Sequence, residues 1–378
     1  MKPRILILGA GFGGMELSTR LSETFGDRID VTLIDKSDAF VFGYSKLDVM
    51  FGKDTLEKVR LPYKRFIKSG VTFRRETITG IDPHTLRVTT NAGTYGADYL
   101  VVALGADYDF AATPGLSDVN EFYSFEGATA LRDILPTFDK GRVLIGVCGA
   151  PYKCPPAPSE AALMLHDYLL QRGVRQNCEI VFTMPLSSPV PPSPDTSRAL
   201  LTAFAERDIT FKGQTRVASI DPGRKAATME DGSTETFDLF FGVPKHRVPN
   251  VVIDSGMSKD GWIPVNPRTL ETPWPNVYAI GDGAATGTPK AGYFAEGEAA
   301  AVAETLIARI NGRGDTGVYA GRGVCYLEFG GDRIGRVDVD FFAEPHPVGI
   351  YHEPSVDLRV HKQEFGSTRR MRWFGMSE

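Results

Sequence analysis

The stretch RILILGAGFGGMELSTRL, residues 4–21, decides the fold: an apolar strand leads into a glycine-rich turn and then a helix. The turn carries Gly9, Gly11 and Gly14 in the spacing G-x-G-x-x-G. The first glycine permits a tight turn, the second lets the backbone approach a pyrophosphate, and the third lets helix and strand pack closely. Free N–H groups at the start of the helix suit phosphates. The stretch therefore predicts a dinucleotide-binding α/β domain.

An acidic residue ends the next predicted strand, as a dinucleotide site requires. This strand, IDVTLIDK at residues 29–36, places Asp35 26 residues beyond Gly9 (35 − 9), with Lys36 directly after it. A carboxylate at this point can accept the ribose hydroxyls. An ordinary strand–helix turn is the alternative, but strand, glycines and acid follow one another in the order that a nucleotide needs. We count Asp35 and Lys36 among the candidate cofactor-binding residues.

Length, charge and composition limit the classes of protein to which the chain can belong. The chain has 378 residues, of which 42% are hydrophobic, enough for two or three packed domains. Its net charge of −5 gives no reason to expect nucleic acid as a partner. No apolar run reaches the ~18–20 residues of a membrane-spanning helix, and no cysteine spacing resembles a zinc or other metal site. Because residues 1–14 enter the strand and glycine turn at once, we expect no signal peptide and a cytoplasmic protein.

Two distant segments contain further glycine turns. Residues 95–109, YGADYLVVALGADYD, read as an apolar strand followed by a turn. Residues 274–306 read as a strand, a loop and a long alanine-rich helix. The turns and the loop supply the remaining candidate cofactor-binding residues: Ala103, Gly105, Gly281, Asp282 and Lys290.

Both segments resemble fingerprints of the FAD-binding disulfide reductase superfamily. In that superfamily the residue matching Asp282 hydrogen-bonds the ribityl chain, and the next helix points its positive end at the flavin. Lys290 either adds to this positive charge or is a solvated surface lysine. The resemblance implies FAD as the cofactor. Since no cysteine occurs in residues 1–147, a covalent thioether to FAD from this region is excluded, and FAD is expected to bind non-covalently.

Residues 141–181 repeat the strand–loop–helix–strand pattern without a second glycine motif. The loop instead holds four prolines around a thiol: Pro151, Cys154, Pro155, Pro156 and Pro158. Prolines stiffen the loop and remove N–H donors that a pyrophosphate would use. We interpret this part as an NAD-like domain that no longer binds NAD.

Cys154 stands just before the predicted helix and beside Lys153. Both neighbours favour a thiolate over a thiol, which predicts a reactive cysteine rather than a small buried apolar residue. Glu160, in the first turn of the helix, either relays a proton or complements the helix dipole.

With these residues, the chain resembles the sulfide:quinone oxidoreductase and flavocytochrome c sulfide dehydrogenase family over residues 1 to about 342. The resemblance is carried by GAPYKCPPAPSEAALML (149–165) and PKAGYFAEGEAAAVA (289–303). It implies that Cys154 works with Cys325, 171 residues later (325 − 154), as a redox pair. Sulfide, or a small thiol or persulfide, would attack the oxidised pair, and FAD would pass two electrons to a quinone. From the sequence alone, Cys325 could equally be an ordinary strand residue.

Two features qualify this resemblance, and the first is that no sequence motif encodes sulfide itself, so a small thiol or persulfide would suit the same cysteines. Second, sulfide:quinone oxidoreductases often carry a histidine after the strand that follows the cysteine helix, but residues 184–194 contain none. His246 is the other candidate for acid–base work, and we read it as a loop residue outside the catalytic set. Cys148 and Cys178 adjoin apolar strands and are expected to be structural.

The C-terminal segment 359–375 differs from the rest in composition. It carries five basic residues against Glu364, in a chain of net charge −5, together with Met371, Trp373 and Phe374. Such a helix can lie on an anionic membrane surface, which would place the protein peripherally on the inner face of the cell membrane, near a lipid quinone. The alternative is a helix packed on a neighbouring domain or subunit; a homodimer is left open.

The fold class expected is α/β, with two Rossmann-like, doubly wound three-layer domains and a C-terminal α+β segment. The predicted parts are an FAD-binding domain (1–110 and 265–312), an NAD-like domain (111–264) and a C-terminal segment with Cys325 and the basic tail (313–378). Within the second part we expect a helix and a strand in 191–213 and a hairpin over 218–243, turning at Asp231-Gly232.

Three other functions compete with sulfide:quinone oxidoreduction. The flavin subunit of a flavocytochrome would normally be exported, which the missing signal peptide disfavours. A type II NADH:quinone dehydrogenase would need an open second glycine loop. A non-enzymatic flavoprotein would not need Cys154 and Cys325 close together.

Overall fold

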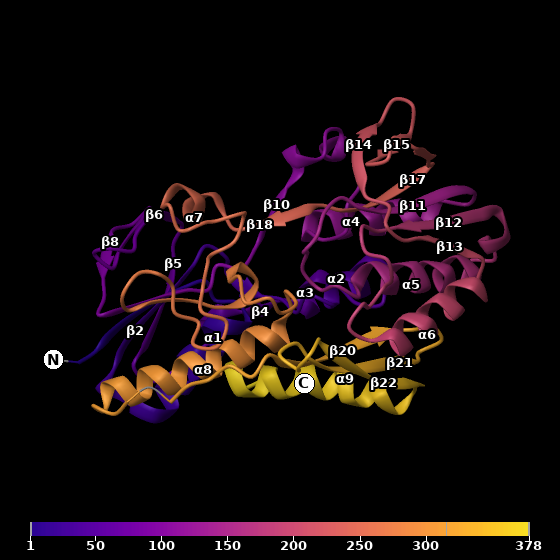
Figure 1. The fold of residues 1–378 in the computed structure, drawn as a ribbon. Coiled ribbons are helices and arrows are strands. Elements are labelled where there is room, and N and C mark those ends of the chain that lie inside the picture. Colours follow the sequence, from indigo (N-terminus) through magenta and orange to yellow (C-terminus); the bar gives the residue numbers. More distant parts are fainter. Residues whose placement is uncertain (1, 315, 377–378) are drawn as a thin grey trace.

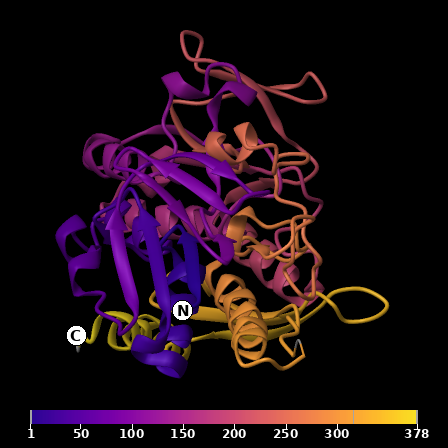
Figure 2. The ribbon, with the colours of Figure 1, turned by 90° about the vertical axis from the view of Figure 1, so that its left-hand side faces the viewer.

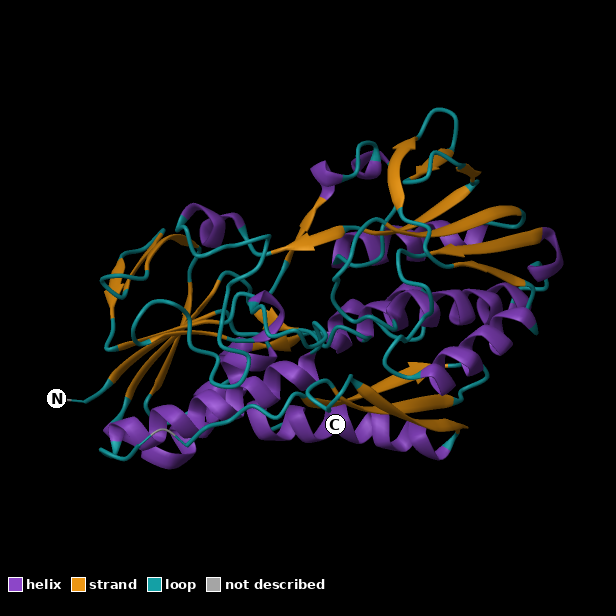
Figure 3. Ribbon diagram, in the orientation of Figure 1, coloured by secondary structure: helices purple, strands orange, loops and turns teal. Residues whose placement is uncertain are grey.

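The computed structural model describes residues 2–314 and 316–376, and shows two parallel sheets with packed helices followed by a smaller antiparallel sheet (Figures 1 and 3). The predicted α/β fold, with two Rossmann-like sheets and a C-terminal α+β segment, is confirmed.

The first parallel sheet joins two distant stretches of chain. Its strands in spatial order are β19 (Val277–Ala279), β9 (Tyr99–Val102), β1 (Arg4–Leu8), β2 (Asp30–Asp35) and β5 (Val71–Arg75). Every pair of neighbours is parallel. Helices α1 (Phe12–Phe25) and α8 (Gly292–Ile310) pack on each other below this sheet in Figure 1. Because parallel sheets are covered on both faces, the central strand β1 is apolar after Arg4, and Ile5 to Leu8 are buried.

The second parallel sheet has the order β13 (Ile209–Lys212), β12 (Cys178–Thr183), β11 (Gly141–Val147) and β17 (Leu239–Val243). Helices α5 (Ala157–Gln171) and α6 (Pro194–Ala205) lie below it in Figure 1, and α4 (Phe125–Ile134) lies near its inner end. Residues 191–213 thus contain the expected helix and strand.

The hairpin expected over residues 218–243 is wrong in its extent. Strands β14 (Val217–Asp221), β15 (Ala226–Met229) and β16 (Thr234–Thr236) form a three-stranded antiparallel sheet. The Asp231-Gly232 turn does lie between β15 and β16, with Gly232 at φ +85°. The fully buried run of β17 belongs to the parallel sheet instead, because continuous apolar residues suit a strand covered on both faces.

Short elements connect the two parallel sheets and cover their edges. β10 (Asp107–Asp109) pairs antiparallel with β18 (Lys245–Arg247) where the chain crosses between the sheets. The others are β3 (Ala39–Phe40), α2 (Ser45–Met50), α3 (Leu56–Val59), β4 (Leu61–Pro62), β6 (Ile78–Asp82), β7 (Arg87–Thr90), β8 (Thr94–Gly96) and α7 (Asn250–Asp254).

The C-terminal piece lies against both halves of the molecule (Figures 1 and 2). Its antiparallel sheet consists of β20 (Arg322–Glu328), β21 (Ile334–Asp340) and β22 (Val348–Ser355), and is followed by α9 (Asp357–Phe374). β20 contacts α5 and α8, while α9 packs on β21 and β22 and touches α1. This packing brings residues 322–328 against one helix from each of the two parallel-sheet domains.

The tail helix α9 is packed on the protein, so the expectation that its aromatic residues face a membrane is wrong for Trp373 and Phe374. Both are buried, and the Trp373 indole N–H donates to Glu16 at 3.0 Å. Arg372 forms ion pairs with Glu16 and Glu23, each at 2.9 Å. Burying these two aromatic side chains against the protein removes their apolar surface from water, so they are not available for contact with lipid. Across residues 2–314 and 316–376, no helix has the length and apolar content needed to cross a membrane.

Candidate active site

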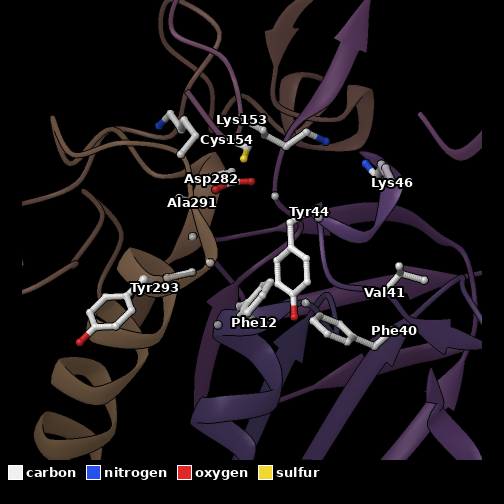
Figure 4. A pocket seen from close by; sticks show the side chains of 18 of the residues that line it. Phe12, Phe40, Val41, Tyr44, Lys46, Lys153, Cys154, Asp282, Ala291 and Tyr293 are labelled. Atoms are coloured by element: carbon white, nitrogen blue, oxygen red, sulfur yellow. The ribbon is translucent and has the colours of Figure 1, made fainter. Parts of the chain in front are cut away.

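A cavity of about 440 Å³ lies where the two sheets and the C-terminal piece meet. The glycine turn after β1, the ends of β9 and β19, the loop before α5, strand β20 and helix α9 all contribute to its wall. Figure 4 shows it from close by, with Phe12, Phe40 and Tyr44 on one side and Cys154, Lys153 and Asp282 on the other. Most of the predicted site residues line it: Gly9, Gly11, Asp35, Ala103, Gly105, Cys154, Glu160, Gly281, Asp282, Lys290 and Cys325.

The glycine turn has the shape of a nucleotide cradle. A Cβ at Gly14 would collide with the carbonyl oxygen of Gly9, so Gly14 serves close packing. A Cβ at Gly11 would meet no atom within 4 Å, because this residue borders the open cavity. The Asp35 carboxylate accepts a hydrogen bond of 2.8 Å from the Ala10 amide and so braces the turn. Lys36, by contrast, is exposed and is absent from the cavity wall.

The opposite end of the cavity holds Asp282 and Lys290. Asp282 sits in the short turn Gly281–Gly283, whose first amide donates to Glu298 at 2.5 Å. Lys290 is buried rather than solvated: its Nζ donates to the Ala284 carbonyl at 2.7 Å and lies 4.1 Å from the centre of the Trp262 ring. Burial raises the pKa of Asp282, and Lys153, Lys290 and Lys46 oppose the rise. The start of α8, at Gly292, also borders the cavity.

Cys154 and Cys325 reach the same cavity from the loop before α5 and from β20, although they are far apart in sequence. Both are free thiols in the structure. Cys154 has φ +48°, a left-handed conformation that is uncommon for a non-glycine residue and tends to occur at functional sites. Its amide donates to Lys290 O at 2.8 Å, and its carbonyl accepts from the Tyr123 hydroxyl at 3.3 Å.

The environment of Cys154 differs from the sequence-based expectation of a favoured thiolate. Burial raises its pKa, and the neighbouring Glu160 and Cys325 raise it further. Lys153 turns away from the thiol: its Nζ donates to Ala106 O at 2.9 Å and lies 4.3 Å from the Tyr108 ring centre. Helix α5 begins only at Ala157. Burial likewise raises the pKa of Cys325, to about 12.

Glu160 is buried, and its charge raises the pKa values of both Cys154 and Cys325. Its Oε1 accepts a hydrogen bond of 3.0 Å from the Glu328 amide. Burial raises its pKa to about 7, while Lys362 counteracts the rise. Lys362 lines the cavity and forms an ion pair of 2.5 Å with Glu328. A carboxyl group with this pKa can exchange protons near neutral pH.

Sequence reasoning missed several cavity residues, because their role depends on contacts between distant segments. Lys46 is a lysine in a short helix whose other residues are mostly buried, and no spacing marks it. The others supply aromatic rings or a charge: Phe12, Tyr44, Tyr123, Tyr293, Lys362 and Phe365. Lys362 and Phe365 belong to α9, the tail segment for which the sequence analysis suggested contact with a membrane surface.

The residues left outside the catalytic set lie away from the cavity wall. Cys148 and Cys178 are buried, and burial raises the pKa of Cys148 to about 12. His246 belongs to strand β18 rather than a loop, and its Nδ1 lies 2.7 Å from the Pro244 carbonyl oxygen. Its ring packs against Tyr108 and Tyr123, and burial lowers its pKa to about 3.

Residues 3–299 match the family model of pyridine nucleotide-disulphide oxidoreductases. The chain belongs to this family. The match covers both parallel sheets, and it confirms the sequence-based interpretation of an oxidoreductase of the disulfide reductase superfamily. The family and the fold together imply a bound flavin.

Among relatives, the mitochondrial sulfide:quinone oxidoreductase of Mus musculus is 24% identical over 356 residues, covering 90% of this chain and 79% of the mouse protein. A type II NADH:quinone oxidoreductase of Staphylococcus saprophyticus is 30% identical over 127 residues, 33% of this chain and 31% of that protein. The crystal structure of the sulfide:quinone oxidoreductase from Aquifex aeolicus superposes with a TM-score of 0.87 at 24% identity, over 98% of this chain and 91% of that one.

Proposed function

We propose that this protein is an FAD-dependent oxidoreductase that oxidises sulfide, or a closely related sulfur compound, at Cys154 and Cys325 and passes two electrons to a quinone. One observation carries the proposal: two cysteines from separate parts of the chain border the same cavity as a glycine turn built for a dinucleotide. The relatives named as sulfide:quinone oxidoreductases support this choice of substrate and acceptor.

The residues present fit FAD. The open space at Gly11 suits the pyrophosphate, Asp35 suits the ribose, and Asp282 with the start of α8 suits the flavin end. In this proposal residues 1–110 and 265–312 hold the cofactor, 111–264 supply Cys154, and 313–378 supply Cys325. FAD would accept electron pairs from sulfur and return them to the acceptor. No cysteine of the first 147 residues is available for a covalent link, so binding would be non-covalent.

The two thiols would act as an oxidised pair. Hydrosulfide forms a new S–S bond to one cysteine sulfur, and the Cys154–Cys325 bond breaks, leaving a persulfide and a thiolate. Glu160, whose pKa burial raises to about 7, would accept the proton that hydrosulfide leaves on the persulfide, or give a proton to the released thiolate. In the reduced pair, the raised pKa values of both cysteines favour neutral thiols over a standing thiolate.

A quinone would lie against the aromatic residues that line the cavity on the α9 side. Tyr293 and Phe365 stack with ring centres 6.2 Å apart and an interplanar angle of 21°. Val324 precedes Cys325 in the wall, and Lys362 offers a cation that could meet a quinone oxygen. A flat apolar ring suits such an aromatic wall, with one polar group to orient it.

A peripheral position on the inner face of the cell membrane would bring the protein to a lipid quinone. Trp373 and Phe374 face the protein, so other side chains would have to touch lipid. Val360 and Met371 of α9 are each 52% exposed, and Val356 just before it is 60% exposed. These apolar groups, beside the basic residues of the same helix, suit an anionic surface.

A second candidate is a type II NADH:quinone dehydrogenase, which the similarity over 127 residues to the Staphylococcus saprophyticus enzyme favours. Here the loop after β11 would have to accept NADH. Its prolines remove backbone donors, and Cys154 occupies the position before α5. The loop therefore favours sulfur chemistry over a second nucleotide.

Anaerobic stopped-flow absorbance of the purified flavoprotein tests the proposal. The protein is mixed separately with sulfide and with NADH, and a soluble quinone is then added. Sulfide should bleach the flavin and quinone should restore it, while NADH should do nothing. Bleaching by NADH alone would establish the dehydrogenase instead. Bleaching by sulfide that is unchanged in Cys154→Ser would remove the cysteine pair from the mechanism.

A further inference from the structure

We propose that Asp167 is a positioning residue that holds strand β20 against helix α5. In this way it keeps Cys325, which lies in β20, beside Cys154, which stands before α5. This role rests on the proposed pairing of the two cysteines. Asp167 lies outside the cavity wall, so it acts through the backbone of the C-terminal piece and not on the reacting atoms.

The two cysteines need contacts other than their own bond to stay together. Both are free thiols in the structure, and the proposed exchange breaks the bond between them in every turnover. Cys154 precedes α5 and Cys325 lies within β20, so their separation depends on how these two elements pack. Helix α5 lies above the C-terminal sheet in Figure 1 and contacts β20. Side chains that fix this packing therefore control the cysteine pair.

Two carboxylates of α5 accept backbone amides from the end of β20 and from the turn after it. Glu160 Oε1 accepts from the Glu328 amide at 3.0 Å, and Asp167 Oδ2 accepts from the Gly331 amide at 2.7 Å. Residues seven apart are separated by almost two helical turns, so both carboxylates lie on one face of α5, about 10 Å apart along its axis. Two such points of attachment prevent a rotation of β20 that one alone would permit.

The turn after β20 is shaped to approach Asp167 closely. Gly330 and Gly331 have φ +77° and +57°, in the left-handed region that favours glycine. A Cβ at Gly330 would lie 2.5 Å from Asp167 Oδ2, which is too close for any larger residue to fit without a shift. The carbonyl of Phe329 accepts from the Arg207 guanidinium at 3.4 Å. The turn is thus attached to α5 and to the residue pair that follows α6.

The Asp167 carboxylate is ionised at neutral pH, as an acceptor of two donors requires. Burial raises its pKa, but hydrogen bonds from His166 and from the Gly331 amide outweigh burial, so the pKa lies below its ordinary value. His166 Nδ1 lies 3.2 Å from Asp167 Oδ1. One carboxylate oxygen therefore faces His166, and the other holds the turn.

Asp167 allows positioning to be tested apart from the chemistry. Glu160 lines the cavity and is assigned the proton transfer, so replacing it would change both properties at once. Replacing Asp167 releases the turn after β20 and leaves the cavity residues in place. The effect of such a variant on the cysteine pair then measures the attachment alone.

The test measures the equilibrium of the cysteine pair without sulfide. Flavin-loaded protein is equilibrated anaerobically with mixtures of reduced and oxidised glutathione. Acid quenching, thiol alkylation and mass spectrometry then give the fraction of Cys154–Cys325 disulfide. Each disulfide formed transfers two electrons and two protons to glutathione disulfide, which becomes two thiols. We expect Asp167→Ala to lower the equilibrium constant by about tenfold, the scale of losing one hydrogen bond to a charged group, which raises the reduction potential by about 30 mV.

Two further variants separate positioning from general destabilisation. Asp167→Asn keeps an oxygen that can accept the Gly331 amide, so it should retain most of the parental equilibrium constant. Asp139→Ala is the matched control, because it removes an ion pair of 2.6 Å with Arg172 at the C-terminal end of α5 that does not involve β20. Flavin content and thermal unfolding establish that each variant is folded, and Asp167→Ser replaces Asp167→Ala if the latter is not.

The outcomes distinguish this role from the proposed function. An equal equilibrium constant in Asp167→Ala and its parent overturns the positioning role, whatever sulfide does to the flavin. A shift of the same size in Asp139→Ala overturns it too, because general loosening would then explain both. A shift confined to Asp167→Ala supports the role even where sulfide fails to bleach the parent flavin, which would overturn sulfide oxidation alone. A parent that forms no such disulfide at any glutathione ratio overturns the pairing and the role together.

Discussion

The backbone amide of Cys154 donates a 2.8 Å hydrogen bond to the carbonyl oxygen of Lys290. Lys153 and Lys290 also form a parallel bridge between their backbones. These contacts join the loop before α5 to the loop before α8, and therefore the cysteine of the second sheet to the Asp282 end of the first. The position of the thiol is set by backbone rather than by flexible side chains, which suits chemistry that depends on orientation.

Replacing either cysteine of the pair should abolish the reaction with sulfide. We expect Cys154→Ser and Cys325→Ser each to slow flavin reduction by roughly 10³-fold or more, the scale of losing a group that forms a covalent intermediate. Single-turnover stopped-flow with sulfide measures this rate. Cys178→Ser, in a strand away from the cavity, is the control and should keep the parental rate. An unaffected rate in Cys325→Ser would contradict the pairing.

The proton-accepting role of Glu160 predicts a pH dependence. Burial raises its pKa to about 7, so the ionised, proton-accepting form increases as the pH rises through about 7. Sulfide-driven flavin reduction should therefore increase over this range in the parent protein, after correction for the ionisation of sulfide itself. Glu160→Gln should be slower and should lose this step, as followed by stopped-flow from pH 5.5 to 8.5. An identical pH profile in the variant would assign the step to another group.

The same shift predicts a change in stability. The folded-state pKa of Glu160 lies above the unfolded value, so its contribution to the unfolding free energy is present at low pH and is lost as the pH rises toward about 7. Glu160→Gln cannot ionise, and its stability should fall less over that interval. Urea unfolding of both proteins at pH 5 and pH 8 measures the difference. If both proteins lost the same unfolding free energy between pH 5 and pH 8, ionisation of Glu160 would not affect the stability of the fold.

The open space at Gly11 predicts selective loss of the cofactor. A methyl group there meets no protein atom within 4 Å, so Gly11→Ala should fold normally but should obstruct a bound pyrophosphate. We expect FAD affinity to fall at least about tenfold, corresponding to ~1.4 kcal/mol. The ratio of flavin to protein absorbance after gel filtration measures the loss. Gly93→Ala, also without close neighbours, should retain FAD; retention by Gly11→Ala as well would argue against this placement of the pyrophosphate.

The buried end of α9 predicts a structural role for the tail. Trp373 is 1% exposed and hydrogen-bonds Glu16, so Trp373→Ala should destabilise the protein by about 3–5 kcal/mol. Met371→Ala, at an exposed position two residues earlier, should change stability by less than about 0.5 kcal/mol. Chemical denaturation of the flavin-loaded proteins compares them. Equal stability of the two variants would mean that the tail helix is not docked in solution.

The local features of this protein could be predicted from the sequence because they depend on neighbouring residues. The glycine spacing after an apolar strand determined the turn at Gly9 and Gly14, and the acid at the end of the next strand determined the bracing contact of Asp35. The proline loop placed Cys154 a few residues before a helix. Short-range backbone geometry suffices for each of these.

Only the tertiary structure decided how distant groups affect one another. It brought Cys325 to the cavity of Cys154, and it turned Lys153 toward Ala106 rather than the thiol. It directed Trp373 into the protein. It also raised the pKa of Cys154, where the sequence favoured a thiolate. Desolvation and pairing depend on what the whole chain packs around a group, and no local pattern of residues encodes that enclosure.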